Sequence, residues 1–238
     1  MRSPASWYSN KGCFSTLDTF NEPVVRVHRQ DEAYRGGMGL GVFVNDVLVT
    51  GEGYLYSGEE IFKVLELDNA KLSFLKKNES QVLSLGEGFG SLLDRFLRHG
   101  VEAKALDLWY HMNHYPVESF TGKKMSEFNS KYYDHLIRGS FTNIPYPNRS
   151  LDLIVASMLF NNIADRDVFI KGLEEMVRVL KVGGELRLVG LQPYQVDYIS
   201  KMYDDVFEQR IDKIEIEKVT KDDTVVLLPV YRAILRKI

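Results

Sequence analysis

A glycine-rich segment, VLSLGEGFG (82–90), has the residue types and spacing of a ligand-binding loop. An apolar run leads into Gly86, Gly88 and Gly90, and a helical pattern begins at Ser91. Glycine lets the backbone turn sharply and approach a ligand closely, because no Cβ stands in the way. Open α/β sheets bind their ligands at the carboxyl ends of strands, where such a loop lies. Structural turns use glycine in the same way, so this segment alone is an unspecific sign.

An acidic residue stands at the end of the next apolar segment, VEAKAL (101–106). Asp107 lies 17 residues beyond Gly90, and Leu108 follows it. A carboxylate at the end of a second strand can accept hydrogen bonds from both hydroxyls of a ribose, and the leucine can lie against a purine. The alternative is an aspartate that caps the next helix. After a glycine loop, the pattern favours ribose binding.

Strand and helix patterns alternate from residue 81 onward. Short apolar strands are predicted at 81–85, 101–106, 151–157 and 185–191. Amphipathic helices are predicted at 91–99 and 167–180, with Gly100 and the pair Gly183-Gly184 as their stops. Two last strands, 211–220 and 224–238, flank the turn 221–223 and predict an antiparallel hairpin. This order predicts an α/β fold with a mostly parallel sheet, helices on both faces and one reversed strand.

The first 80 residues have a different pattern and predict an N-terminal extension or cap. Residues 1–35 are polar and aromatic with weak periodicity, which predicts a loop or an arm. Short apolar runs predict a hairpin within 42–56, and a capping-box spacing after it begins a helix over about 58–76. The ligand-binding domain is accordingly expected to span 81–238.

Four segments in register make residues 80–238 resemble the class I S-adenosylmethionine-dependent methyltransferases. They are VLSLGEGFG (82–90), Asp107, NIPYPNRSLDLIVAS (143–157) and RVLKVGGEL (178–186). In the family these segments are the glycine loop, the acidic end of strand two, the segment before strand four, and the turn before strand five. The resemblance implies a Rossmann-like, seven-stranded sheet with a terminal antiparallel hairpin. It also implies S-adenosylmethionine as cofactor, with S-adenosylhomocysteine as product.

The resemblance also assigns roles to individual residues, with two departures from the family pattern. Ser84 replaces an acidic residue that supports the glycine loop, and Ser140 replaces an acidic residue that meets the adenine amino group. The Ser140 hydroxyl or the backbone of Phe141 can take over the second role. The predicted cofactor-binding residues are Gly86, Glu87, Gly88, Gly90, Asp107, Leu108, Ser140, Phe141 and Ser157.

The tetrapeptide Asn143-Ile144-Pro145-Tyr146 matches a signature of methyltransferases that modify amino groups on bases. In those enzymes the signature follows strand four, whereas here it precedes 151–157, which is the predicted strand four. A motif match counts only in its structural context. The segment is therefore predicted to be a loop.

The methyl acceptor is not encoded in an obvious motif. In-line transfer from a sulfonium depends mainly on bringing two reactants together, so no catalytic residue is assigned. The candidates for a substrate pocket are Tyr110, His111, Asn161 and Asn162. Each has a plainer alternative as a polar loop residue or a satisfied histidine. The long aromatic segment 108–138 and the N-terminal extension are the expected sources of specificity.

The amino-acid composition limits the classes of partner that this protein is expected to bind. The formal net charge of −3 and a pI near 6.0 argue against a large nucleic-acid surface and favour a small molecule or a protein as acceptor. The single cysteine, Cys13, excludes an internal disulfide and a cysteine zinc site, and no metal is expected. No signal peptide and no apolar run of membrane length stand out, which predicts a cytoplasmic protein that does not bind membranes.

Two other functions compete with catalysis of methyl transfer. Ser84 and Ser140 are compatible with a catalytically silent module that binds a partner or serves as a scaffold. A nicotinamide-dependent oxidoreductase shares the ribose carboxylate. Its fingerprint is G-x-G-x-x-G, however, and position 91 is Ser.

Overall fold

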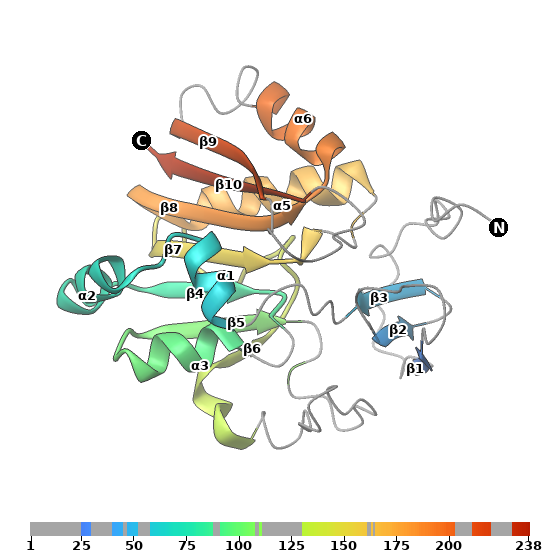
Figure 1. The fold of residues 1–238 in the computed structure, drawn as a ribbon, viewed down its shortest axis with the longest axis horizontal. Helices are drawn as coiled ribbons and strands as arrows, with labels where there is room; N and C mark the ends of the chain where they lie inside the picture. The colour runs from blue at the N-terminus through green and yellow to red at the C-terminus, as the bar shows by residue number, and fades with distance from the viewer. Residues whose placement is uncertain are drawn as a thin grey trace.

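The computed structural model describes residues 25–29, 40–44, 47–51, 58–87, 91–107, 110, 130–160, 163, 165–202, 211–219 and 230–238. Its centre is a seven-stranded sheet with strand order β6-β5-β4-β7-β8-β10-β9 (Figure 1). The strands are β4 (Val82–Leu85), β5 (Ala103–Asp107), β6 (Leu136–Arg138), β7 (Leu151–Ser157), β8 (Leu180–Leu191), β9 (Ile211–Val219) and β10 (Val230–Lys237). Only β10 runs against its neighbours β8 and β9. The predicted Rossmann-like sheet with a terminal hairpin is confirmed.

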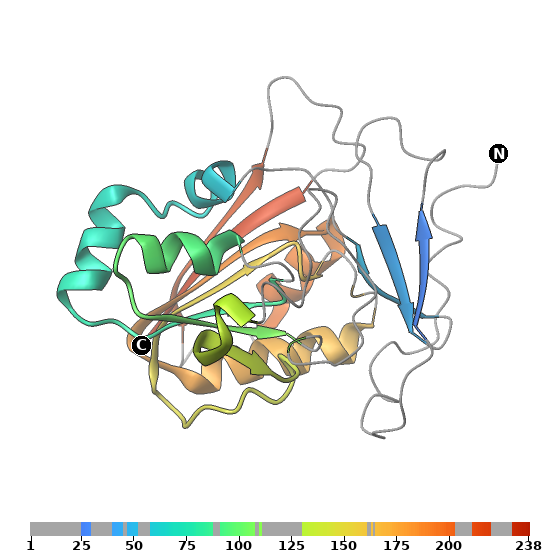
Figure 2. The same ribbon diagram turned by 90° about the horizontal axis from the view of Figure 1, so that it is seen from below.

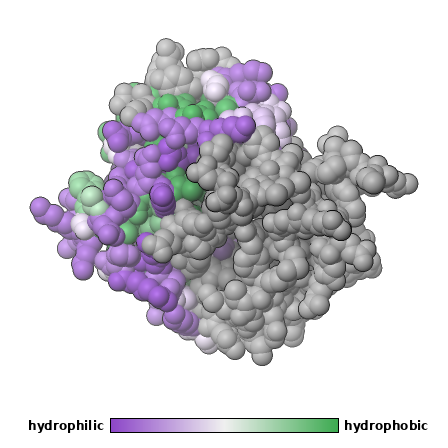
Figure 3. Space-filling model, viewed as in Figure 1, coloured by the Kyte–Doolittle hydropathy of each residue, from purple (hydrophilic) through white to green (hydrophobic). Residues whose placement is uncertain are grey.

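Helices cover both faces of this sheet (Figure 2). One face carries α1 (Gly58–Val64), α2 (Asn69–Lys77) and α3 (Ser91–Arg98), and the other carries α5 (Arg166–Val179) and α6 (Pro193–Met202). A short 3-10 helix, η2 (Tyr133–His135), leads into β6. On the face shown in Figure 3, hydrophilic side chains gather around α2 and α3 at the rim of the described surface, as expected for helices with one solvated side.

Two apolar cores follow from the alternation of side chains along the strands. Leu83 and Leu85 of β4 pack with α5 and α6, whereas Val82 packs with α1, α2 and α3. The central strand β7 is buried on both faces, which explains its almost continuous apolar sequence. Burial of each large aliphatic side chain contributes about 1.5–3 kcal/mol, so both cores stabilise the packing of the helices on the sheet.

The predicted helix over 58–76 is wrong in its continuity, because the chain forms two helices there. Glu66 adopts a left-handed conformation (φ 54°), which ends α1. The Asp68 side chain then accepts a hydrogen bond from the Lys71 backbone N–H at 2.7 Å and begins α2. The break brings both Leu65 and Leu67 into the core, where they are at most 2 % exposed. One straight helix cannot turn residues two apart toward the same core.

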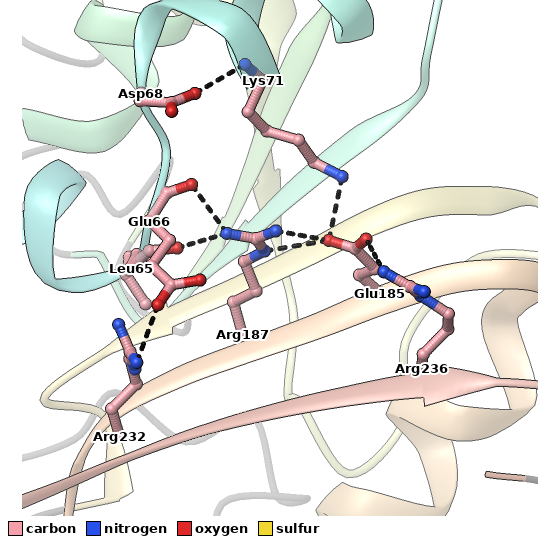
Figure 4. A network of polar contacts seen from close by, with 8 residues as sticks. All are labelled: Leu65, Glu66, Asp68, Lys71, Glu185, Arg187, Arg232 and Arg236. Carbon is pink, nitrogen blue, oxygen red and sulfur yellow. Dashed lines mark hydrogen bonds and ion pairs between the residues drawn. The ribbon is translucent and has the colours of Figure 1, made fainter. Parts of the chain in front are cut away.

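A buried polar network fastens the α1–α2 connection to the sheet (Figure 4). The Arg187 guanidinium on β8 donates hydrogen bonds to the carbonyl oxygens of Leu65 (2.6 Å) and Glu66 (2.8 Å). It also pairs with Glu185 at 2.7 Å. Glu185 in turn pairs with Lys71 of α2 at 2.9 Å. These contacts satisfy carbonyl groups that the end of α1 leaves without helical partners.

Two further boundaries differ from the sequence prediction. The helix α5 ends at Val179 rather than at Gly183-Gly184, because Leu180 is already extended and pairs with Leu151 in the sheet. Gly183 (φ 77°) instead lies within β8. The strand β6 lies at the end of segment 108–138, in which the sequence analysis assigned no strand. No helix among the described residues has the length and apolarity needed to cross a membrane.

A second, three-stranded sheet precedes α1. It consists of β1 (Val25–Arg29), β2 (Leu40–Val44) and β3 (Val47–Gly51), all antiparallel. The hairpin β2–β3 confirms the strands predicted within 42–56. The prediction of loop or arm for 1–35 is wrong for β1, which pairs with β2 despite its weak periodicity. The division of the chain at residue 80 stays a prediction. In the structure, Phe62 and Leu72 of α1 and α2 share a core with the large sheet.

Candidate cofactor site

The glycine loop begins where β4 ends. Gly86 has φ 61°, and its N–H donates a hydrogen bond to the Leu106 carbonyl of β5 at 2.9 Å. A Cβ at Gly86 would lie 2.5 Å from Leu159 Cδ1. Both the left-handed backbone and the close side chain therefore require glycine here. The result is a sharp turn at the carboxyl edge of the sheet, with the Leu159 side chain packed against Gly86.

A second tight turn faces Gly86 from the end of β7. Met158 has φ 58°, which is unusual for a residue other than glycine, and its N–H donates to the Val189 carbonyl at 2.8 Å. A Cβ at Gly190 would lie 2.6 Å from Met158 Sδ, so glycine there makes the turn possible. The turn places Leu159 against Gly86. Strained backbone of this kind is common at functional sites.

Asp107 closes the neighbouring strand β5 and is 8 % exposed. Its backbone carbonyl accepts a hydrogen bond from the Gly139 N–H at 3.2 Å, which ties the turn after β6 to the end of β5. The ends of β4, β5 and β6 therefore lie side by side at one edge of the sheet. The arrangement brings Gly86 and Asp107 to the same edge, and a shared binding site for them stays a prediction.

Ser140 and Phe141 belong to that turn. The Ser140 hydroxyl makes a hydrogen bond of 2.8 Å with the Thr142 hydroxyl and accepts one from the Thr142 N–H at 3.2 Å. The Phe141 ring is 4 % exposed and packs edge-on against Phe160, with ring centroids 5.6 Å apart. The Ser140 side chain is thus engaged within its own turn, and the Phe141 ring anchors that turn in the core.

Glu87 is the second residue of the glycine loop, and its two carboxyl oxygens have different surroundings. The Leu93 N–H, in the first turn of α3, donates to Glu87 Oε1 at 2.6 Å. Glu87 Oε2 and Ser84 Oγ are both buried, and the Ser84 hydroxyl acts on the Glu87 carboxyl as a hydrogen-bond partner.

The surroundings of Glu87 favour its neutral form. Burial raises the pKa of Glu87 to about 7, and the negative charge of Asp107 acts in the same direction. The nearby Ser84 hydroxyl and the N–H groups of Leu93 and Leu92 lower this pKa but do not offset the burial. A group that titrates near neutral pH at the edge of an α/β sheet marks a candidate functional site.

The other candidate residues are distributed as follows. Ser157 ends β7 beside the Met158 turn and pairs with Val189. Tyr110 is fully buried and packs in the core on the α3 face, so a substrate role for it stays a prediction. Six candidates lie outside the described residues, namely Gly88, Gly90, Leu108, His111, Asn161 and Asn162.

The tetrapeptide 143–146 forms a loop, as predicted, between β6 and β7. Arg178, near the end of α5, donates hydrogen bonds to the carbonyl oxygens of Ile144 (3.0 Å) and Tyr146 (2.9 Å). Glu175 accepts one from the Ile144 N–H at 3.0 Å. These contacts explain the segment as a structural loop held against α5. Among the described residues, no group of three His, Cys, Asp or Glu side chains is placed to hold a metal ion.

The sequence does not predict the close contact between Met158 and Gly190 at this edge of the sheet. Met158 and Gly190 are distant in the chain, and only the isolated glycine within an apolar strand hints at a close backbone approach. Ser84 and Glu87 are visible in the sequence as residues of the loop, but the burial of the Glu87 carboxyl depends on the packing of α3.

A family model described as a methyltransferase domain matches residues 83–188. This segment contains β4, β5, β7 and most of β8, together with the Gly86 and Met158 turns. This match and the fold support a class I S-adenosylmethionine-dependent methyltransferase. The resemblance found in the sequence is therefore confirmed, whereas the cofactor site at the edge formed by β4, β5 and β7 stays a prediction.

Similar proteins support this family at modest identity. Ubiquinone/menaquinone biosynthesis C-methyltransferases are 38 % identical over 61 residues in Stenotrophomonas maltophilia and 28 % identical over 131 residues in Vibrio campbellii. These matches cover 26 % and 52 % of this chain, and 23 % and 46 % of the relatives. The chain thus spans less than half the length of these relatives.

Two solved structures share the fold of this chain. The PH0226 protein from Pyrococcus horikoshii has a TM-score of 0.50 at 14 % identity and covers 76 % of this chain and 91 % of its own. A putative sarcosine dimethylglycine methyltransferase from Galdieria sulphuraria has a TM-score of 0.50 at 17 % identity, with coverages of 75 % and 85 %. At these identities the likeness concerns the fold alone.

Proposed function

We propose that this chain transfers a methyl group from S-adenosylmethionine to a small-molecule acceptor. One observation carries the proposal, the left-handed glycine turn at Gly86 (φ 61°), which lies at the carboxyl end of β4. The turn lies beside Asp107 at the end of the adjacent strand. A glycine loop next to a carboxylate at this edge suits a nucleoside with a charged tail.

The residues present fit the cofactor. The Asp107 carboxylate would hold the ribose hydroxyls, since a charged acceptor makes strong hydrogen bonds to two donors. The Gly86 backbone would lie against the methionine part. For the adenine, the backbone of Phe141 is the better candidate, because the Ser140 hydroxyl already bonds to Thr142. Ser157 stands at the end of β7, on the side where the reacting groups would meet.

Positioning is the main catalytic demand on these residues. S-adenosylmethionine supplies an activated methyl group on a positively charged sulfur. The chain needs to hold an acceptor in line with that methyl at about 3–3.5 Å, which can supply about 7–11 kcal/mol of the barrier. The left-handed turns at Gly86 and Met158 would position the backbone against which the cofactor is aligned. No general base is assigned.

A small molecule is the favoured acceptor for two reasons. The two relatives above act, by their names, in ubiquinone and menaquinone biosynthesis, as C-methyltransferases. The net charge of −3 lacks the basic excess of a protein that binds nucleic acid. A protein acceptor is the second possibility.

Calorimetric titration with S-adenosylmethionine and S-adenosylhomocysteine tests the cofactor. We expect dissociation constants near micromolar, equivalent to about −8 kcal/mol. A nicotinamide dinucleotide is the control ligand and is expected not to bind. If the folded protein binds neither sulfur compound, the proposal is wrong and a scaffold role becomes the better hypothesis. Product formation with pools of small metabolites, peptides and RNA then identifies the acceptor class.

A further inference from the structure

The side chain of Gln195 connects two loops at the carboxyl edge of the sheet. Gln195 lies in α6 and is completely buried. Its Nε2 donates hydrogen bonds to the carbonyl oxygens of Phe160 (2.8 Å) and Ile163 (3.1 Å), which follow β7. Its Oε1 accepts a hydrogen bond from the Gln192 N–H (2.9 Å), which follows β8. One buried amide thus uses both its donors and its acceptor to hold the chain after two neighbouring parallel strands.

Four hydrogen bonds between described residues hold the carbonyl oxygens of Phe160 and Ile163. Besides the bond from Gln195, the Phe160 oxygen accepts one from the Ile163 N–H at 3.0 Å, which closes a turn between these two residues. The Ile163 oxygen also accepts one from the Tyr194 hydroxyl of α6 at 2.9 Å. Each carbonyl oxygen has two lone pairs, so both oxygens are fully used. A buried polar network in which every member is satisfied specifies one arrangement of the chain.

Strand order places this turn on the side of the site from which an acceptor would approach. β4 lies between β5 and β7, so Gly86 stands between Asp107 and the chain after β7. In the proposed function Asp107 holds the ribose and Gly86 lies against the methionine part, which leaves the side of β7 and β8 for the acceptor. We propose that Gln195 is a positioning residue for the methyl acceptor, because it fixes the turn between Phe160 and Ile163. The inference rests on the proposed function.

An amide at position 195 costs desolvation that an apolar side chain would avoid. Burial of a polar group is tolerated where hydrogen bonds replace those to water. Gln195 recovers them from backbone groups that all belong to the chain after β7 and β8. Ile199, one turn further along α6, is equally buried and fills the core without any polar group. Because Gln195 is completely buried, it acts through the backbone of the turn and does not touch an acceptor.

Gln195→Met tests this role, because methionine has a similar length and fills the core but donates no hydrogen bond. The probes are S-adenosylmethionine with a tritium-labelled methyl group and a pool of small metabolites as acceptors. We expect calorimetry to give the wild-type affinity for S-adenosylmethionine and S-adenosylhomocysteine. Methyl transfer at saturating S-adenosylmethionine is expected to fall about ten- to a hundredfold, because a misplacement of about 1 Å can cost that much in rate.

Gln195→Glu is expected to make methyl transfer depend on pH. A protonated carboxyl keeps one donor for the two carbonyl oxygens and an acceptor for the Gln192 N–H, whereas an ionised carboxylate keeps no donor and faces both oxygens. Burial raises the pKa of a carboxyl at this position, so the neutral form persists toward neutral pH. The rate of this variant relative to the wild type is expected to be highest near pH 6 and to fall toward pH 8.5. Its relative affinity for S-adenosylhomocysteine is expected to stay constant over this range.

Two further variants of α6 separate positioning from stability. Ile199→Ala removes a completely buried side chain from the same helix and leaves the Gln195 amide in place, so it lowers stability by creating a cavity. It is expected to transfer methyl groups at the wild-type rate at temperatures at which it stays folded. Tyr194→Phe removes one of the four hydrogen bonds and is expected to lose less transfer than Gln195→Met does.

The outcomes distinguish this inference from the proposed function. If Gln195→Met is folded and transfers methyl groups as fast as the wild type, the inference is wrong. A loss in Ile199→Ala as large as that in Gln195→Met would assign the effect to stability and would overturn it as well. If the folded wild type binds no S-adenosylmethionine or transfers no methyl group to the pool, the proposed function itself has failed, and the inference fails with it.

Discussion

The ring of Phe141 occupies the space that a side chain at Gly172 would need. A Cβ built at Gly172 would lie 2.2 Å from Phe141 Cε2. Gly172 belongs to α5, and Phe141 belongs to the turn after β6 at the carboxyl edge of the sheet. The absence of a Cβ at Gly172 thus leaves room for the aromatic ring, which holds this turn against α5.

Gly172→Ala is expected to destabilise the protein, although alanine is the better helix former by about 1 kcal/mol. The added methyl must displace a ring that is packed in the core, and such overpacking costs about 1–3 kcal/mol. Urea denaturation measures the loss, and calorimetry should show weaker cofactor binding because the turn shifts. Adding Phe141→Leu makes room and should recover part of the stability. A more stable Gly172→Ala protein would show that the ring moves freely.

Gly86→Ala is expected to lower stability and to abolish cofactor binding. The alanine must adopt φ 61° at a cost of about 1–2 kcal/mol, and its methyl must also displace Leu159. Gly183→Ala is the matched control, because Gly183 has φ 77° but no atom within 4 Å of the position that an added methyl group would take. The control is expected to show the backbone cost alone and to bind the cofactor normally. Equal losses in both variants would contradict a role for the Leu159 contact.

The features that the sequence predicts here are those that depend on neighbours in the chain. Gly86 follows a strand and precedes a helix, and Asp107 ends the next strand. Their residue types and their order along the chain therefore predict that each lies at the end of a strand. The apolar sequence of 151–157 predicts a strand buried on both faces, and the structure has it with those bounds. Register and strand order then bring Gly86 and Asp107 to one edge.

The features that the sequence does not predict depend on contacts between distant segments. The left-handed turn at Glu66 is stabilised by Arg187, which lies 121 residues away. The turn at Met158 needs the absence of a side chain at Gly190, which belongs to the next strand. Local propensity carries no sign of either. The burial of the Glu87 carboxyl likewise depends on α3, whose Leu93 N–H donates a hydrogen bond to it.

Asp107→Ala is expected to weaken binding of S-adenosylmethionine about a hundredfold, or about 2.7 kcal/mol, while the protein stays folded. The reason is the loss of hydrogen bonds between a charged acceptor and two ribose hydroxyls. Asp152→Asn is the control, since Asp152 lies on β7 and holds Gln81 and Lys181 at the opposite end of the strand. Calorimetric titration of both variants with S-adenosylmethionine measures the change in affinity. Unchanged affinity of Asp107→Ala would remove the ribose assignment.

Acid should weaken the network around Glu185. Burial alone raises the pKa of this carboxyl, but the hydrogen bonds and charges of Lys71 and Arg187 lower it to about 2. Because the folded-state pKa lies below the ordinary value of 4.5, the unfolded chain binds the proton first as the pH falls. The stabilisation is therefore complete above about pH 4.5 and is lost as the pH falls toward 2. It amounts to about 3 kcal/mol.

Glu185→Gln tests this pH dependence. At pH 7 the variant is expected to be less stable than the wild type by about 3 kcal/mol, because Arg187 and Lys71 lose a charged partner inside the protein. The difference should shrink below pH 4.5 and vanish near pH 2, as urea denaturation across this range will show. Glu217→Gln is the control, since Glu217 is 67 % exposed and its pair with Arg232 is expected to contribute less than about 1 kcal/mol. A deficit of Glu185→Gln that does not change with pH would mean that shape rather than charge holds α1 and α2 on the sheet.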